Sequence, residues 1–522
     1  MISLSVTTYL LIAITIVALI LILVDQIRSK KAPPKIFDSE EPTLPDPPGP
    51  KPWPVLGSLH ILGRYDVPYK AFADLVKVYD SQVIKLRMGS VPCVVVNGLE
   101  NIKEVLINKG HNFDSRPNFT RYHLLFGGNK ENSLAFCDWS EIQKARRELL
   151  RAHTFPRAFT TRYNQLNGII GGEMKFLVDY LTSISGTAIH AKPLFLHACG
   201  NVFMKYFCSK SFGLEHKAFR NMVYNFDKIF YEVNQGYAAD FMPFLMPLHH
   251  RNMTRMAGWS HKIRLFVEEH VIGDRLDSWK SVIPEEDYVD CLINHVKTNS
   301  EPNMSWETAM FSLEDIIGGH SAVGNLLIKI IGFLATRPHI QEAAQREIDS
   351  VENCGDFVGL ENRSSMPYIE AIILETIRII ASPIVPHVAS QDSSIYSIIY
   401  ILLFFIILRY RLHFSLIEKD TFIFLNNYDL NMSDELWQSP GEFMPERFVQ
   451  NGRLLKPEYF LPFGGGRRSC MGYKMVQNIS FSTIATLLKH FTILPVEKED
   501  YTIPIGNLAL PELSFNFRFE KR

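Results

Sequence analysis

The stretch FLPFGGGRRSCMG, residues 460–472, places one cysteine between a run of glycines and a segment with helical spacing of apolar residues. Glycines permit turns with positive φ and leave backbone N–H groups uncovered. A helix that begins near Met471 would direct its positive end at the Cys470 sulfur and stabilise a thiolate. The loop therefore predicts that Cys470 has a chemical role. A glycine-rich turn around a buried, structural cysteine is the alternative.

Arg468 strengthens the chemical interpretation, because it lies two residues before Cys470 and can hold an anion on the same face. A thiolate that ligates a haem iron requires a fixed anionic sulfur, N–H donors that tune it and a cation for a haem propionate. The loop offers all three, so its pattern favours axial ligation of a haem.

The composition narrows the class of protein. The chain has 522 residues, of which 47% are hydrophobic, which is enough for a large core. Its net charge of −1 argues against nucleic acid as a partner. The seven cysteines are odd in number and include no C-x-x-C pair, which argues against a disulfide framework or a zinc ribbon and favours a reducing compartment.

The first residues predict a membrane anchor over 1–31. Residues 2–24 carry no charge and are long enough to cross a hydrocarbon core of about 30 Å. The basic residues Arg28, Lys30 and Lys31 follow this stretch, so the rest of the chain is expected in the cytosol. A cleaved signal peptide is the alternative, but the basic n-region is missing. Residues 32–55 are proline-rich and predict a stiff linker.

The remainder, residues 56–522, predicts one mainly α domain with minor β structure. Residues 83–89 and 92–98 are expected to form a hairpin, and short strands return after about Tyr501. Apolar residues at i, i+3, i+4 and i+7 predict helices over 141–153, 163–182, 261–273, 306–336, 339–352 and 367–380.

The cysteine loop resembles the signature F-x-x-G-x-R-x-C-x-G of the cytochromes P-450 at every fixed position. The matching residues are Phe463, Gly466, Arg468, Cys470 and Gly472. The resemblance extends from the anchor to the end of the chain and includes FDSRP at 113–117. It implies a cytochrome P-450 fold: a helical haem domain with small β-sheets and an N-terminal transmembrane anchor, with Cys470 as the metal ligand of haem b.

Three further residues resemble the Glu–Arg–Arg cluster of that family. Glu375 and Arg378 stand in LETIRII, and Arg447 stands in PERF. A lone E-x-x-R is usually a surface pair on a helix. The resemblance implies instead a structural cluster that locks the fold around the haem.

The resemblance also implies contacts with the haem propionates. The family usually carries a tryptophan followed four residues later by an arginine; here Trp139 is present, but Gln143 occupies the arginine position. Lys144, Arg146 and Arg147 are nearby substitutes, with a solvated basic helix face as the alternative. His387 in SPIVPHVAS stands where the family places a propionate-binding residue, although a lone histidine is often incidental.

The segment IIGGHSAVGN departs from the family's [AG]-G-x-[DE]-T pattern. Gly318 and Gly319 match it, His320 takes the free position, Ser321 replaces the acid and Ala322 replaces the threonine. Bare backbone at the glycines is expected to admit oxygen, water or substrate. We expect protons to arrive by ordered water and substrate, with Ser321 as the only side-chain member of the relay and His320 turned away from the haem.

Residues 396–416 form an apolar insertion where the family has a short hairpin. The apolar run within it, Tyr396–Leu408, is too short for a comfortable membrane span, and a second crossing would separate the two halves of one haem site. A buried strand extension is possible, but the segment is interpreted as an accidental insertion, such as an unspliced intron.

The expected activity is that of a haem-thiolate monooxygenase in the endoplasmic reticulum membrane, using O₂ and electrons from NADPH through a reductase. A basic face that steers the reductase is predicted from Lys144, Arg146, Arg147, Arg467 and Lys474. Residues 119–135, 318–323 and 383–388 are the expected pocket segments.

The texts LEDIIGGHSAVGNLL and RRELLRAHTFP resemble the Spook group of insect cytochromes P-450. That group acts early in ecdysteroid synthesis, on the path from 7-dehydrocholesterol to the ketodiol. Two alternatives stay open: a haem-thiolate isomerase or dehydratase that needs no reductase, and a non-catalytic sterol-binding haem protein.

Overall fold

The computed structural model describes residues 45–65, 67–279, 285–352, 354–403 and 406–522. The predicted anchor and most of the predicted linker lie outside these residues. The chain divides into two compact units. The first comprises residues up to Phe113 together with Tyr237–Pro247 and Val385–Asn426, and the second contains the remainder. The predicted boundaries of anchor, linker and catalytic domain stay predictions.

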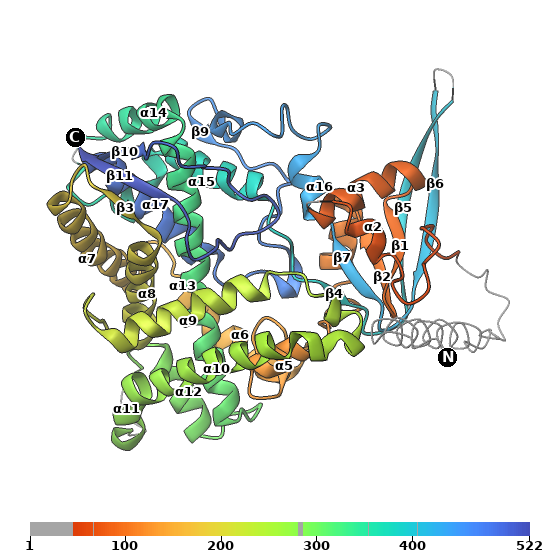
Figure 1. Cartoon of the computed structure of the whole chain (residues 1–522), viewed down its shortest axis with the longest axis horizontal. Helices are drawn as coiled ribbons and strands as arrows, with labels where there is room; N and C mark the ends of the chain where they lie inside the picture. Colours follow the sequence, from red (N-terminus) through yellow and green to blue (C-terminus); the bar gives the residue numbers. More distant parts are fainter. Residues whose placement is uncertain (1–44, 66, 280–284, 353, 404–405) are drawn as a thin grey trace, which may run out of the picture. The chain divides into compact units, whose positions relative to one another are not determined.

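The first unit is built on a four-stranded sheet with strand order β1-β2-β7-β4. The predicted hairpin is confirmed: β1 (Val83–Met88) pairs antiparallel with β2 (Val91–Val96), and Val83 lies opposite Val96. The strand β7 (Phe422–Leu425) then pairs parallel to β2 and antiparallel to β4 (His387–Val388). The helices α2 (Leu59–Leu62), α3 (Pro68–Tyr79) and α4 (Leu99–Lys103) complete the unit (Figure 1).

The predicted insertion forms a separate two-stranded ribbon in the same unit. Its strands β5 (Ser393–Leu403) and β6 (Ile406–Ile417) pair antiparallel, with Ser393 opposite Ile417 (Figure 1). The pairing of β4 with β7, on either side of the insertion, is intact. The insertion therefore leaves the sheet between β1 and β7 uninterrupted, because it extends as a ribbon of its own.

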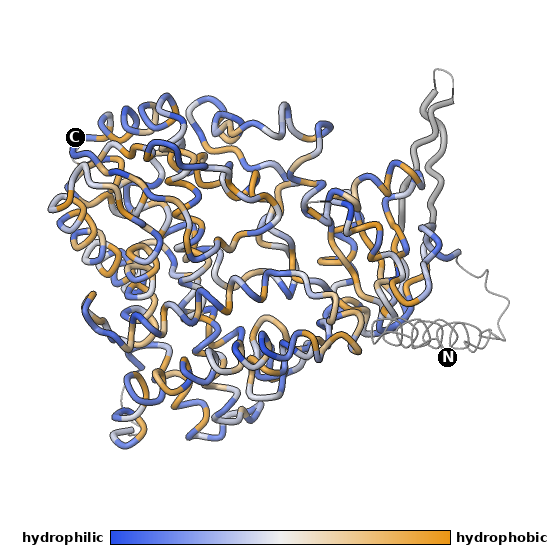
Figure 2. Tube along the Cα trace, viewed as in Figure 1, coloured by the Kyte–Doolittle hydropathy of each residue, from blue (hydrophilic) through white to orange (hydrophobic). Residues whose placement is uncertain are grey.

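The second unit is mainly helical, and its helices include all those predicted from apolar periodicity. Figure 2 shows hydrophobic and hydrophilic residues alternating along these segments, as expected for helices that cover a core. The helices are α5 (Thr120–Leu125), α6 (Glu141–Thr154), α7 (Thr161–Ser183), α8 (Lys192–Cys208), α9 (Lys217–Val233), α10 (His250–Val267), α11 (Gly273–Ser278), α12 (Tyr288–Lys297), α13 (Trp306–Ala335), α14 (Pro338–Asp349), α15 (Pro367–Ile380), α16 (Asn427–Met432) and α17 (Tyr473–His490).

The long helix α13 forms the centre of this unit. Ser305 caps its start, because the Ser305 side chain accepts a hydrogen bond from the Thr308 N–H. Among the described residues, α13 alone is long and apolar enough to cross a membrane, but 83% of its most apolar window is buried inside the protein. Small sheets flank the helices: β10 (Phe491–Pro495), β11 (Asn516–Lys521) and β3 (Ala188–His190) in one, β8 (Val449–Gln450) and β9 (Arg453–Leu454) in the other.

Candidate functional site

The cysteine loop folds back on itself immediately before α17. Gly464 and Gly466 have φ of 69° and 61°, in the left-handed region that favours glycine. These turns allow the Cys470 N–H to donate a hydrogen bond of 3.0 Å to the Phe463 carbonyl. Phe463 and Cys470, two fixed positions of the signature, are thereby joined through the backbone.

The Cys470 thiol is accessible and lies beside the start of α17. Surrounding protein atoms displace water around it and raise its pKa, while hydrogen bonds from the backbone at Gly472 and Tyr473 and the charge of Arg147 lower it. An added Cβ at Gly472 would stand 4.0 Å from the sulfur, which is ordinary van der Waals contact. These N–H groups are the donors expected to stabilise a thiolate.

Arg467 and Arg468 fix the loop against Trp139 and Asp114. Arg468 donates hydrogen bonds of 2.8 Å to the Asp114 carbonyl and 2.6 Å to the Cys137 carbonyl. Arg467 pairs with the Asp114 carboxylate at 2.9 Å. Both guanidinium groups lie over the Trp139 ring, 4.8 and 5.6 Å from its centre.

A cluster of cations surrounds this loop. Burial and then the charge of Arg468 lower the pKa of Arg116 to about 9 and that of Arg147 to about 10. Anionic groups would relieve this repulsion, and the carboxylates of a haem are such groups. With the accessible thiol and its N–H donors, the residues present therefore fit a haem bound through Cys470. Arg116 is a member of this cluster. It lies in the sequence FDSRP, but the sequence alone did not indicate its role.

The basic residues of α6 lie in different environments, and their role as substitutes for the missing arginine stays a prediction. Arg146 is buried and donates hydrogen bonds of 2.8 Å to the Asn132 carbonyl and 3.1 Å to the Glu131 carbonyl. Lys144 is exposed and lies 3.8 Å from Glu141. Arg147 instead donates to the Ser469 carbonyl at 2.6 Å.

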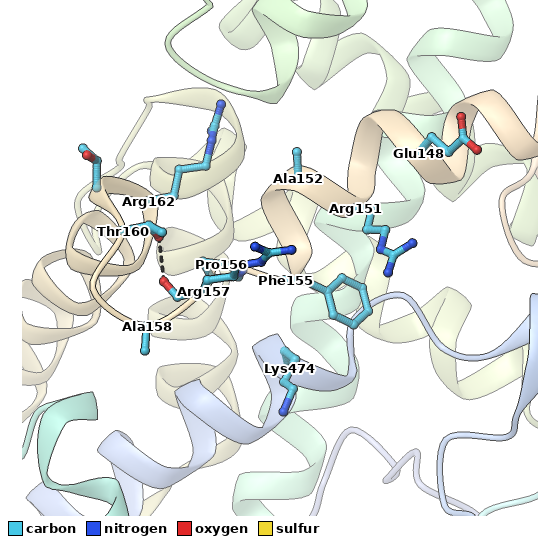
Figure 3. Close-up of a pocket in the computed structure, with 11 residues that line it drawn as sticks. Glu148, Arg151, Ala152, Phe155, Pro156, Arg157, Ala158, Thr160, Arg162 and Lys474 are labelled. Atoms are coloured by element: carbon cyan, nitrogen blue, oxygen red, sulfur yellow. Dashed lines mark hydrogen bonds between the residues drawn. The ribbon is translucent and has the colours of Figure 1, made fainter.

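The residues of the predicted basic face differ in their contacts, and the face stays a prediction. Arg146, Arg147 and Arg467 bond within the protein. By contrast, Lys144 is exposed, and Lys474, which lines the pocket shown in Figure 3, forms no ion pair in the described part of the chain.

His387 lies in the first unit, on β4. It is buried, and its Nδ1 lies 2.6 Å from the Phe113 carbonyl, to which it donates. Its role as a propionate contact stays a prediction.

Glu375, Arg378 and Arg447 form one buried cluster. Arg378 binds Glu375 in bidentate fashion at 2.7 and 2.8 Å, and Arg447 reaches the same carboxylate at 3.1 Å. The Met444 N–H donates a further hydrogen bond of 2.9 Å to it. Both side chains of the Glu375–Arg378 pair are fully buried, so this is not a solvated pair on a helix surface.

Beyond the first turn of α13, the residues that stay partly accessible lie at i, i+3, i+4 and i+7 on one face, and they are Asp315, Gly318, Gly319 and Ala322. A Cβ at Gly318 would stand 2.9 Å from Phe226, and one at Gly319 would stand 3.1 Å from Phe203. The glycines therefore admit aromatic rings from α9 and α8. The expectation that their bare backbone serves the approach of oxygen, water or substrate stays a prediction.

His320 and Ser321 are both fully buried. His320 packs edge-on against Phe226 at 5.5 Å between ring centres, and its Nδ1 lies 2.7 Å from the Ile317 carbonyl. Burial lowers its pKa to about 4, so it is neutral at pH 7. The Ser321 Oγ forms no hydrogen bond with the residues that the structure describes.

Asp315 is a site residue that the sequence motifs did not indicate. Its Oδ2 accepts hydrogen bonds of 2.9 Å from the Ser133 hydroxyl and 2.6 Å from the Leu134 N–H. Burial raises its pKa to about 6. It thus ties residues 133–134, in an expected pocket segment, to the accessible face of α13.

The comparisons with known proteins agree with this geometry. A sequence model described as Cytochrome P450 matches residues 47–519. The chain is 37% identical to cytochrome P450 307a1 of Drosophila melanogaster over 491 residues, which cover 89% of this chain and 87% of that protein. It is 29% identical to cytochrome P450 1A1 of Sparus aurata and 28% to that of Macaca fascicularis, with 90% of each chain covered. The chain is therefore a member of the cytochrome P450 family of haem-thiolate monooxygenases.

Proposed function

We propose that this monooxygenase oxidises a sterol in an early step of ecdysteroid biosynthesis from 7-dehydrocholesterol. The proposal rests on the resemblance of the α13 and α6 sequences to the Spook group. It is supported by the higher identity to an insect relative, 37%, than to the vertebrate relatives, 27–29%.

The observation that supports the monooxygenase chemistry is the accessible Cys470 sulfur, which has backbone N–H groups of Gly472 and Tyr473 directed at it and the charge of Arg147 nearby. When bound through a cysteine thiolate, a haem would supply the activation of dioxygen with two electrons from a reductase and two protons, with one oxygen atom inserted into an unactivated C–H bond and the other released as water. Cys470 would hold the iron. Phe463, Gly466 and Gly472 shape the loop, while Arg116, Arg468 and Trp139 would hold the propionates.

Other residues would orient the substrate and move protons. Asp315 anchors the loop at 133–134 beside the accessible face of α13. We propose that Ser321 orders a water through its unsatisfied hydroxyl, and that a substrate hydroxyl completes the path. His320 is neutral and enclosed by aromatic rings, which favours a packing role.

The proposed partners are an NADPH-dependent cytochrome reductase, a sterol and the endoplasmic reticulum membrane, through the predicted anchor. NADPH as the electron source and the membrane location follow from the resemblance.

The test is to express the chain with a reductase, supply 7-dehydrocholesterol and identify the products by mass spectrometry. A second variant lacks residues 396–416. Because Ser393 lies opposite Ile417, which brings the two ends of the deletion together, and because the β4–β7 pairs involve no residue of the ribbon, this deletion is expected to leave the sheet intact. Cys470→Ala is the inactive control, and Cys354→Ala, which changes a partly buried free thiol elsewhere, is its matched companion.

We expect an oxidised sterol that depends on NADPH and reductase and disappears in Cys470→Ala. Full activity without NADPH would indicate that the protein is an isomerase or dehydratase. A sterol-induced spectral shift without any product would indicate a binding protein. Sequencing of the mature transcript across residues 395–417 decides whether the ribbon is present in the natural protein.

A further inference from the structure

Two polar residues of α13 continue the stripe of its accessible face. Asn325 and Lys329 follow Ala322 at spacings of three and seven residues, so they lie on the side of the helix that carries Gly318 and Ala322. Unlike those two residues, both are fully buried. The irregular loop 504–511 binds both of them through its backbone. The accessible face of α13 therefore ends where this loop covers the helix.

The Lys329 ammonium group holds one end of the loop. Its Nζ donates hydrogen bonds of 3.1 Å to the Pro504 carbonyl and 2.6 Å to the Asn507 carbonyl. In the described part of the chain no carboxylate pairs with Lys329, and burial lowers its pKa to about 7. A buried cation without a counter-ion is costly, because water no longer solvates it. An apolar side chain would fill the same space without that cost, so the position of the loop is what the ammonium group contributes.

A second set of buried side chains holds the other end of the loop. The Asn325 Oδ1 accepts a hydrogen bond of 2.9 Å from the Leu510 N–H. Lys192 of α8 donates one of 2.8 Å to the Leu510 carbonyl and pairs with Asp227 of α9 at 2.7 Å. Asp227 in turn accepts a hydrogen bond of 2.9 Å from the Asn325 Nδ2. Side chains from three helices thus fix both ends of the loop.

Between its two attachments the loop carries the apolar residues Ile505 and Leu508, which stay partly accessible. A helix rises by about 1.5 Å per residue, so Asn325 lies about 9 Å along α13 from Gly319. A substrate that extends along the accessible face by that distance would meet the loop, and apolar side chains suit contact with a hydrocarbon skeleton.

We propose that Lys329 is a positioning residue for the substrate. By holding the Pro504 and Asn507 carbonyls, it fixes loop 504–511 as a wall at one end of the space over the accessible face of α13. The position of that wall determines how far a substrate extends along the helix, and therefore which of its carbons is oxidised. Only the choice of a sterol as a test substrate rests on the proposed function.

The experiment uses the full chain, haem-loaded and purified in detergent. Lys329→Met removes both donated hydrogen bonds and leaves no charge unpaired. Lys329→Gln keeps N–H donors and is the rescue variant. The matched control is Lys489→Met, because Lys489 of α17 likewise donates to two carbonyls of a loop, those of Cys354 and Gly355. The carbon-monoxide spectrum of each variant confirms that it is folded and loaded.

Three measurements separate positioning from general stability. Hydrogen exchange of residues 504–511 reports the order of the loop without any ligand. Changes in haem absorbance report the binding of imidazole and of biphenylimidazole, an imidazole whose biphenyl group extends further from the iron. Turnover of 7-dehydrocholesterol with a reductase gives kcat, KM and the ratio of products.

In Lys329→Met we expect about tenfold faster exchange of the loop amides. Biphenylimidazole should bind about tenfold more weakly and imidazole within about twofold of the parent, because only the longer ligand must order the loop. The KM for the sterol should rise by a similar factor while kcat changes less, and the ratio of products should shift. Lys329→Gln should restore these values, and Lys489→Met should match the parent.

Faster exchange with unchanged binding of both imidazoles would show that Lys329 only stabilises the loop, and the proposal would be wrong. Equal weakening of both imidazoles would indicate damage to the haem site and would also overturn it, as would unchanged exchange in Lys329→Met. If the parent does not oxidise 7-dehydrocholesterol, the proposed function fails, and the two imidazoles still decide the positioning role.

Discussion

The Arg147 guanidinium donates a hydrogen bond of 2.6 Å to the carbonyl of Ser469, the residue before Cys470. This contact couples α6 to the cysteine loop and places a positive charge near the sulfur. The family has an arginine at the position of Gln143, which carries no charge. Arg147 therefore supplies the cation to the cysteine loop. Gln143 is buried and donates to the Leu134 carbonyl at 2.7 Å.

We expect Arg147→Leu to weaken haem-thiolate binding. The substitution removes a charge-assisted hydrogen bond, typically worth about 1.5–3 kcal/mol, and a charge that lowers the Cys470 pKa. The measurement is the fraction of protein whose reduced carbon-monoxide complex shows the thiolate-type absorption band. Lys144→Leu on the same helix is the control and should change this fraction little. Equal loss in both variants would show that general destabilisation of α6 is responsible.

The sequence could not choose between Arg146 and Arg147, because successive residues on a helix diverge by about 100° and four basic or amide side chains compete for the position. A structural cluster of Glu375, Arg378 and Arg447 was implied by the family resemblance and not by the short motifs themselves, because a lone E-x-x-R is usually a surface pair on a helix. The partners of Gly318 and Gly319 were beyond prediction, because Phe226 and Phe203 lie about a hundred residues earlier in the chain and approach only in the folded core.

Glu375→Gln is expected to unfold the protein at markedly lower denaturant concentration and to leave little haem-loaded protein. Both arginines would then lie beside a neutral amide. Removing one charge of a buried ion pair typically lowers the free energy of unfolding by about 3–5 kcal/mol. Glu342→Gln is the control, because Glu342 forms a 4.0 Å surface pair with Arg346, and such pairs contribute under about 1 kcal/mol. Denaturant unfolding with haem absorbance measures both. Parent-like unfolding of Glu375→Gln would rule out a structural role for the cluster.

Asp315 should make the stability of the protein depend on pH. Burial raises its pKa from 3.8 to about 6, so between these values the folded protein binds more protons at this group than the unfolded chain does. Stability from this group is therefore greatest below about pH 4 and falls as the pH rises to about 6, by at most about 3 kcal/mol. Asp315→Asn should remove this contribution to the pH dependence of the free energy of unfolding.

The measurement is the free energy of unfolding at several pH values between 4 and 7, compared as differences between variant and parent. Asp274→Asn, which changes an exposed carboxylate of α11, is the matched control. A constant difference for Asp315→Asn would mean that Asp315 has an ordinary pKa in the folded protein.

Ser321 and His320 are neighbours on α13 with different expected roles, and their ranking tests the proton path. Ser321→Ala removes a buried hydroxyl that bonds to no described residue, so it should cost little stability while slowing product formation and diverting electrons to peroxide. His320→Leu removes a neutral ring packed against Phe226 and Phe203. We expect it to lower stability by about 1–3 kcal/mol through altered packing and to leave the ratio of product to NADPH consumed near that of the parent.

Peroxide and product are measured together at fixed haem content. If His320→Leu abolishes coupling while Ser321→Ala does not, the histidine carries the protons, and the packing role assigned to it here is wrong.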